Sequence, residues 1–94
     1  MIESNEAPIY KHVIQWVQEY GQSGEPDQRA VQTFMDCETR EAVNGLRAEL
    51  IAISAGKFND QTFDVVVGIK RRVLHSSYAA WAQLMLQWIA AYKV

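Results

Sequence analysis

The run Lys70-Arg71-Arg72 concentrates positive charge, and Lys57 lies a short distance before it in the sequence. Lysine and arginine side chains bind the phosphates of nucleic acids, and a helix would present this run within one turn. Cations near the end of a helix also complement its macrodipole and keep one face solvated without binding any ligand. Because the net charge of the chain is −2, nucleic-acid binding is kept only as an alternative function. It would use Lys57, Lys70, Arg71 and Arg72.

The carboxylates of Asp36, Glu38 and Glu41 are candidates for metal ligands or for an acid/base pair. Glu38 and Glu41 are three positions apart and would share a helix face. Dinuclear sites of helical bundles, however, use a Glu-x-x-His pattern, and neither His12 nor His75 follows a glutamate by three positions. A carboxylate cluster that stabilises a helix N-terminus is the favoured interpretation, and we predict no metal site.

Cys37, His12 and His75 would form a nucleophile with its base, or a zinc site, only if the fold brought them together. Their spacing does not favour either arrangement. We expect Cys37 to be a small buried hydrophobe and the two histidines to be surface or cap residues. An enzyme is therefore the weakest hypothesis, with no catalytic residues to propose.

The segment Ala55-Gly56-Lys57-Phe58 resembles the end of a phosphate-binding loop, but Ile51 stands where the first glycine of that loop would be. The hydroxyl residue that would hold magnesium is replaced by phenylalanine. Asn59, Asp60 and Asp64 do not have the spacing of a calcium loop, which also needs a central glycine and a terminal glutamate. We expect no cofactor.

The aromatic residues near the C-terminus support the favoured function. Tryptophan and tyrosine dominate the energetics of interfaces when they are partly exposed, and the chain contains 3 Trp and 4 Tyr. The alternative, that all of them are internal, stays open at this point. We predict an interaction module that binds a protein partner or a second copy of itself through its last helix. The predicted contact residues are Tyr78, Trp81, Met85, Trp88 and Tyr92.

Length and composition set the scale of the fold. A chain of 94 residues with 49% apolar and 21% charged residues is expected to form a single domain, 1–94, with one small core. Cys37 is the only cysteine, no secretory leader is visible, and no apolar stretch is long enough to span a bilayer. These features predict a cytoplasmic location and no membrane association.

The periodicity of apolar residues predicts an all-α fold, a compact bundle of four to five helices. In the first helix Val13, Trp16 and Tyr20 recur at helical spacing, with Ser4 or Asn5 as a cap. Pro8 suits its first turn. Whether the second and third helices are continuous is left open. The expected helices span approximately 6–20, 27–37, 40–55, 60–74 and 77–92.

The segment 60–74 is ambiguous. Its helical interpretation places Phe63, Val66, Val67 and Leu74 on one side, but its valines are typical of a strand. The alternative is an α+β fold in which 50–54 and 62–68 pair as a hairpin. We prefer the helix, since no third strand candidate completes a sheet.

The last helix has the clearest pattern. Its large apolar residues recur at spacings of three and four from Tyr78 to Tyr92, after a Ser76-Ser77 cap. Most other positions are also apolar, and a helix that is apolar nearly all round is normally surrounded. Either the earlier helices wrap it, or a second chain covers what they leave bare.

Overall fold

The protein was examined as a computed structural model, which describes residues 10–22 and 24–92. This part of the chain contains helices and turns but no strand, so the all-α prediction is confirmed and the hairpin of 50–54 with 62–68 is wrong. Because α1 continues into η1, and α4 continues through η2 into α5, the described chain forms five helical segments. The elements in chain order are α1 (Lys11–Trp16), the π-helical turn η1 (Val17–Gly21), α2 (Asp27–Cys37), α3 (Arg40–Ser54), α4 (Asp60–Phe63), the π-helical turn η2 (Asp64–Gly68), α5 (Ile69–His75) and α6 (Tyr78–Ala91).

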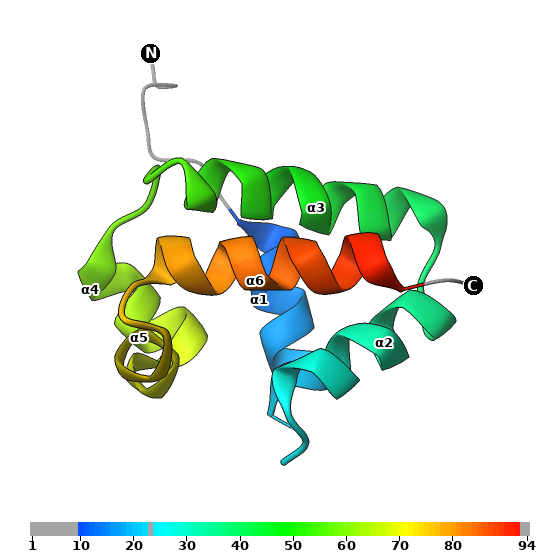
Figure 1. Ribbon diagram of the computed structural model, residues 1–94, viewed down its shortest axis with the longest axis horizontal. Helices are drawn as coiled ribbons and strands as arrows, with labels where there is room; N and C mark the ends of the chain where they lie inside the picture. Colours follow the sequence, from blue (N-terminus) through cyan, green and yellow to red (C-terminus); the bar gives the residue numbers. More distant parts are fainter. Residues whose placement is uncertain (1–9, 23, 93–94) are drawn as a thin grey trace.

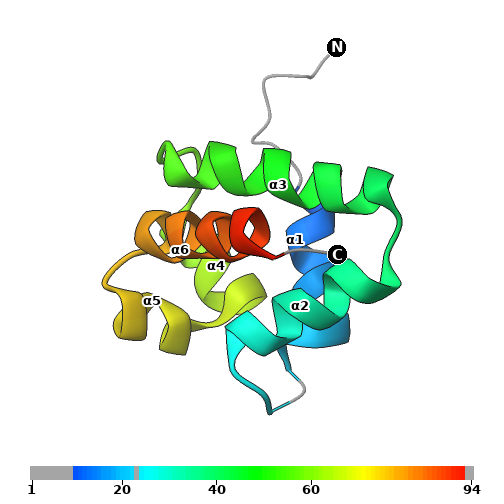
Figure 2. The same cartoon turned by 45° about the vertical axis from the view of Figure 1, so that its right-hand side comes forward.

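Helix α6 lies in the middle of the molecule. Figure 1 shows α3 running antiparallel to α6 along one side of it, while α2 and α5 lie on the opposite side, and α3 makes the most extensive contact with α6. The turned view in Figure 2 keeps this arrangement, with α2 and α5 next to different ends of α6. The earlier helices therefore bury one stripe of the last helix and leave its other residues half-buried or exposed, so neither of the two expectations for it is met in full.

Side-chain caps set several helix boundaries, including the one predicted at Ser76-Ser77. Thr39 accepts a hydrogen bond from the Ala42 N–H, and Ser77 accepts one from the Ala80 N–H, at 3.1 and 3.0 Å. Asn59 likewise accepts from Thr62, at 3.0 Å. Because Thr39, the residue that caps α3, has extended backbone angles, α2 and α3 are two separate helices rather than one bent helix.

The first helix is capped by a distant residue. Residues 6–9 of the predicted helix, together with the proposed caps Ser4 and Asn5 and with Pro8, lie outside the described residues. Within the described range, the carboxylate of Glu49 on α3 accepts hydrogen bonds from the backbone N–H groups of His12 and Val13, at 3.1 and 2.9 Å. A carboxylate at this end also complements the helix dipole. Helix α3 thus supplies the N-terminal cap of α1.

The predicted helix 60–74 is interrupted at Gly68, whose φ of +115° is open to glycine but strained for other residues. The break changes the phase of the residues that follow it. Phe63 and Val67 are buried as predicted and Val66 is half-buried, but Leu74 is 76% exposed. The prediction that all of them share one buried side is wrong for Leu74, because it assumed a continuous helix.

The core contains side chains from each of the five helical segments, but α5 itself has no buried residue. In α6 the buried positions include the predicted aromatic seam as far as Met85. Four rings pack edge to face or stacked at one end of the core, with centroids 5.3 to 5.8 Å apart. The aromatic residues of that cluster are Tyr10, Phe58, Phe63 and Tyr78.

Gly45 allows α1 to approach α3 closely. A Cβ atom at this position would lie 2.5 Å from ring atoms of His12, which is too close for any real contact. The His12 ring cannot easily move away, because its Nδ1 atom is 2.5 Å from the Glu49 carboxylate. The absence of a side chain at position 45 is therefore a packing requirement.

We expect Gly45→Ala to destabilise the fold, although alanine in a helix interior is normally favoured over glycine by about 1 kcal/mol. In a His12→Ala background the steric conflict is gone, so the same substitution should stabilise the protein. Urea unfolding of the four proteins measures both effects. A stabilising effect of Gly45→Ala in both backgrounds would contradict this account of the contact.

Candidate functional site

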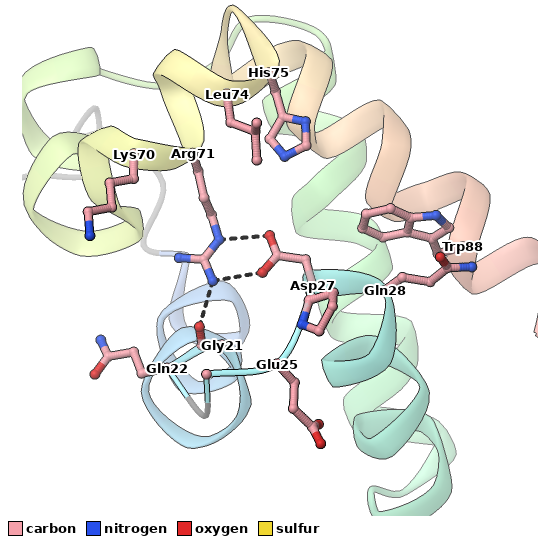
Figure 3. Close-up of a pocket in the computed structure, with 12 residues that line it drawn as sticks. Gly21, Gln22, Glu25, Asp27, Gln28, Lys70, Arg71, Leu74, His75 and Trp88 are labelled. Atoms are coloured by element: carbon pink, nitrogen blue, oxygen red, sulfur yellow. Dashed lines mark hydrogen bonds and ion pairs between the residues drawn. The ribbon is translucent and has the colours of Figure 1, made fainter.

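Arg71 joins parts of the chain that are distant in sequence. From α5 its guanidinium donates Nε–H to Asp27 Oδ2 and Nη2–H to Asp27 Oδ1, both at 2.8 Å (Figure 3). It also donates to the carbonyl oxygens of Gly21 and Val67, both at 2.7 Å. These two carbonyls lie at the ends of η1 and η2, where a helix leaves acceptors without partners. One side chain thus satisfies two helix ends and pairs with the first residue of a third helix.

The ion pair is surrounded by tryptophans. Its side chains are mostly buried, 15% exposed for Arg71 and 13% for Asp27. Trp81 donates its indole N–H to Asp27 Oδ2 at 3.0 Å, and the Arg71 guanidinium carbon is 5.4 Å from the ring centroid of Trp16. That distance is suitable for a cation–π interaction. The Trp16 N–H is buried without a hydrogen-bond partner in the described part of the chain, so Trp16 contributes its ring face rather than its donor.

A groove of about 680 Å³ lies over this ion pair. The loop before α2 and the start of α2 form one wall, including Gln22, Pro26 and Gln28, and α5 forms the facing wall. In Figure 3 Leu74 and His75 lie on one side of the Arg71–Asp27 pair, and Gln22 lies on the other. We call this the α2–α5 groove. Trp88 of α6 also lines it.

Helix α5 directs its arginines toward the protein and its aliphatic side chains toward solvent, which is the reverse of a typical surface helix. Its two arginines turn toward carboxylates of the protein, whereas Ile69, Val73 and Leu74 are 50%, 74% and 76% exposed. A surface helix normally buries its aliphatic residues and exposes its charges. We call Ile69, Val73 and Leu74 the α5 apolar face. Single exposed aliphatic residues are common, but a group on one short helix marks a surface that another molecule can cover.

The predicted contact residues of the last helix fall into two groups. Tyr78, Trp81 and Met85 are fully buried, so the prediction that they contact a partner is wrong. They belong to the core because this stripe of α6 is enclosed by the helices that pack against it, α3, α2 and α5. Trp88 is half-buried and lines the groove, and half-buried Tyr92 donates its hydroxyl hydrogen to Asp36.

The basic residues are also divided. Arg72 donates to both oxygens of Asp64, at 2.9 and 3.1 Å, and Tyr78 donates its hydroxyl to the same carboxylate at 2.6 Å. These hydrogen bonds lower the pKa of the Asp64 carboxyl, and the bond from Arg72 has the largest effect. Lys57 and Lys70 are exposed, and within the described residues neither ammonium group has an ion-pair partner. Arg71 and Arg72 are thus each paired with a carboxylate of the protein, which the run of charges did not reveal.

The other candidate residues do not form a site. Cys37 is exposed, not buried as expected, and His12 is half-buried against Glu49 rather than a surface residue. Among the residues that the structure describes, no three His, Cys, Asp or Glu side chains gather closely enough to bind a metal ion. Asp36 and Glu38 instead accept hydrogen bonds from tyrosine hydroxyls.

Sequence reasoning did not identify Asp27 or the α5 apolar face. The bidentate partner of Arg71 is 44 positions away in the chain, and no local pattern indicates such a pairing. The i, i+4 spacing of Ile69 and Val73 was visible as a signal. A continuous helix over 60–74 places both residues outside its apolar stripe, so the pattern does not mark them as a separate face.

Comparison of the chain with protein-family models, with curated proteins and with solved structures gives no significant match. None of the helices in the described part of the chain combines the length and the apolar character that crossing a bilayer requires.

We expect Asp27→Asn and Arg71→Met each to lower the free energy of unfolding by about 2–4 kcal/mol, since each leaves a mostly buried charge without its partner. The double variant should lose less than the sum of the two, with a coupling of at least ~1 kcal/mol. Urea unfolding measures this cycle. The matched cycle of Asp64 with Arg72, a more exposed pair, should give a smaller coupling. Additive effects of the two substitutions would show that Asp27 and Arg71 do not stabilise the fold as a pair.

Burial and the hydrogen bond to Asp64 raise the pKa of Tyr78 from 10.0 to about 12. The fold favours the neutral hydroxyl, so this contribution to stability is complete below pH 10 and is lost as the pH rises toward 12. We expect the free energy of unfolding to fall over that range, and to fall less steeply in Tyr78→Phe. Urea unfolding at a series of alkaline pH values checks this. Equal slopes for both proteins would show that Tyr78 is not held neutral by the fold.

Proposed function

We propose that this protein is an interaction module that binds another polypeptide through the α5 apolar face and the adjoining α2–α5 groove. The observation that carries the proposal is the reversed polarity of α5, whose aliphatic side chains face solvent while its arginines face the protein. The helix turns its arginines inward and leaves Val73 and Leu74 about three-quarters exposed, at 74% and 76%. A protein partner would remove this apolar surface from water, which is favourable by about 25 cal/mol per Å².

The groove adds a means of recognition beside this face. Leu74 belongs to both, and half-buried Trp88 gives the groove an aromatic residue of the kind that anchors interfaces. Lys70, His75 and Gln28 provide polar groups around it. An aliphatic or aromatic side chain of the partner would enter between Leu74 and Trp88, and polar groups of the partner would bond to the rim.

This proposal moves the predicted interaction surface from α6 to α5. Trp88 alone of the five predicted contact residues keeps a direct role, because Tyr78, Trp81 and Met85 are buried. The nucleic-acid alternative has less support. Its two arginines are paired with carboxylates, which leaves Lys57 and Lys70 as the exposed cations of the predicted set.

We expect the double substitution Val73→Glu with Leu74→Glu to weaken partner binding at least about tenfold, since it places charges where apolar contact is needed. Self-association is measured by sedimentation over a range of protein concentrations. Binding to another protein is measured by titrating a partner identified from its retention on the immobilised wild-type chain.

The matched control is Ile51→Glu, which changes an exposed aliphatic residue on α3 in the same way. It should leave binding unchanged, and both variants should remain folded because the altered residues are on the surface. The proposal is wrong if the chain is a monomer at all concentrations and retains no protein in a way that depends on Val73 and Leu74. Equal weakening by the control variant would also exclude α5 as the contact.

A further inference from the structure

Helix α5 is attached to the rest of the molecule in an unusual way. None of its seven residues is buried, whereas the preceding turn η2 is anchored by buried Val67 and the following helix α6 begins with buried Tyr78. Packing of apolar side chains is what normally holds a helix of this length in place. In α5 that source of stability is weak, because the helix contacts α6 but none of its side chains is buried.

Both ends of α5 have backbone angles that separate it from its neighbours. Gly68, immediately before it, has a φ of +115°, and Ser76, immediately after it, has a φ of +79°. Ser76 is the only residue other than glycine with positive φ in the described part of the chain. Residues at the ends of elements are where a moving segment absorbs its change of backbone angles.

The contact that fastens α5 across the groove is the guanidinium of Arg71. It bonds to Asp27 and to the Gly21 carbonyl on the facing wall and covers the ring of Trp16. Arg72 bonds to Asp64, which belongs to the adjacent turn η2, so that pair does not cross the groove. The hydrogen bonds that hold α5 across the groove are therefore concentrated in one side chain.

We propose that α5 is a hinged flap, with its hinges at Gly68 and Ser76 and its latch formed by Arg71 on Asp27. When the latch releases, α5 moves away as a unit, the α2–α5 groove widens, and the face of Trp16 under Arg71 opens to solvent. The role of this movement in admitting a partner rests on the function proposed above. The movement itself is a property of the free protein and is tested without any partner.

Amide hydrogen exchange on the free chain measures this opening. We expect amides within α5, such as those of Leu74 and His75, to exchange at least roughly a hundredfold faster than those of buried Leu50 and Met85. Their rates should agree with one another and change little with low concentrations of urea, which identifies a local opening. A helix that only frays would instead show a gradient of rates from its ends.

Arg71→Lys tests the latch, because lysine keeps the charge but loses the fork that bonds to both carboxylate oxygens. It should increase exchange in α5 by about tenfold relative to Leu50 and Met85. The control Arg29→Lys alters an exposed arginine of α2 and should leave that ratio unchanged.

A second readout uses quenching of tryptophan fluorescence by acrylamide. Trp88→Phe removes the half-exposed tryptophan, so the remaining signal comes from Trp16 and Trp81, which are fully buried. In that background Arg71→Lys should increase quenching severalfold while the protein stays folded.

The flap is excluded if α5 amides exchange only with global unfolding, showing the same urea dependence as Leu50. It is also excluded if Arg71→Lys speeds exchange equally everywhere and leaves quenching unchanged. Either result leaves the proposed partner surface to be decided by the Val73 and Leu74 variants. Conversely, if the Val73 and Leu74 variants bind as well as the wild type, the proposed partner surface is wrong, but the flap is still decided by the exchange rates of the free chain.

Discussion

The salt bridge between Arg71 and Asp27 is the constraint on which the arrangement of this protein depends. It is mostly buried, and it would be costly if the two charges were not also hydrogen-bonded to other groups. Arg71 additionally bonds to two backbone carbonyls, and Asp27 accepts from the Trp81 indole. The charges are thereby compensated, and the ends of η1 and η2 gain the acceptor partners that their geometry requires. Four of the five helical segments meet at this one pair.

The same pair explains why α5 lies as it does. Because its arginines are directed inward to carboxylates, its aliphatic residues are left on the outside, with Leu74 at the groove. A helix held by ion pairs rather than by buried apolar surface is a weakly attached element, and weakly attached elements are those that move or bind. The proposed surface and the proposed flap are therefore consequences of one local inversion of polarity.

Much of the fold could be predicted because its signals are local. Ser77 acts as the cap that its position indicated, and the spacing of large residues from Tyr78 onward identified α6 correctly. The candidate site could not be predicted in the same way. Gly68 breaks the helical phase through a backbone angle that periodicity does not encode, and Arg71 pairs across 44 positions. Aromatic content alone also could not separate a core seam from a contact surface, since both use the same residues.

The most direct test of this account is the behaviour of the Arg71 side chain in solution, observed by nitrogen-15 NMR of the arginine guanidinium groups. If the salt bridge is formed, the Nε–H of Arg71 should exchange slowly with water and its guanidinium should rotate slowly, because four of its five N–H donors are bonded. Exposed Arg29 provides the reference for a free side chain. An Arg71 group that rotates and exchanges as fast as that of Arg29 would contradict the central claim.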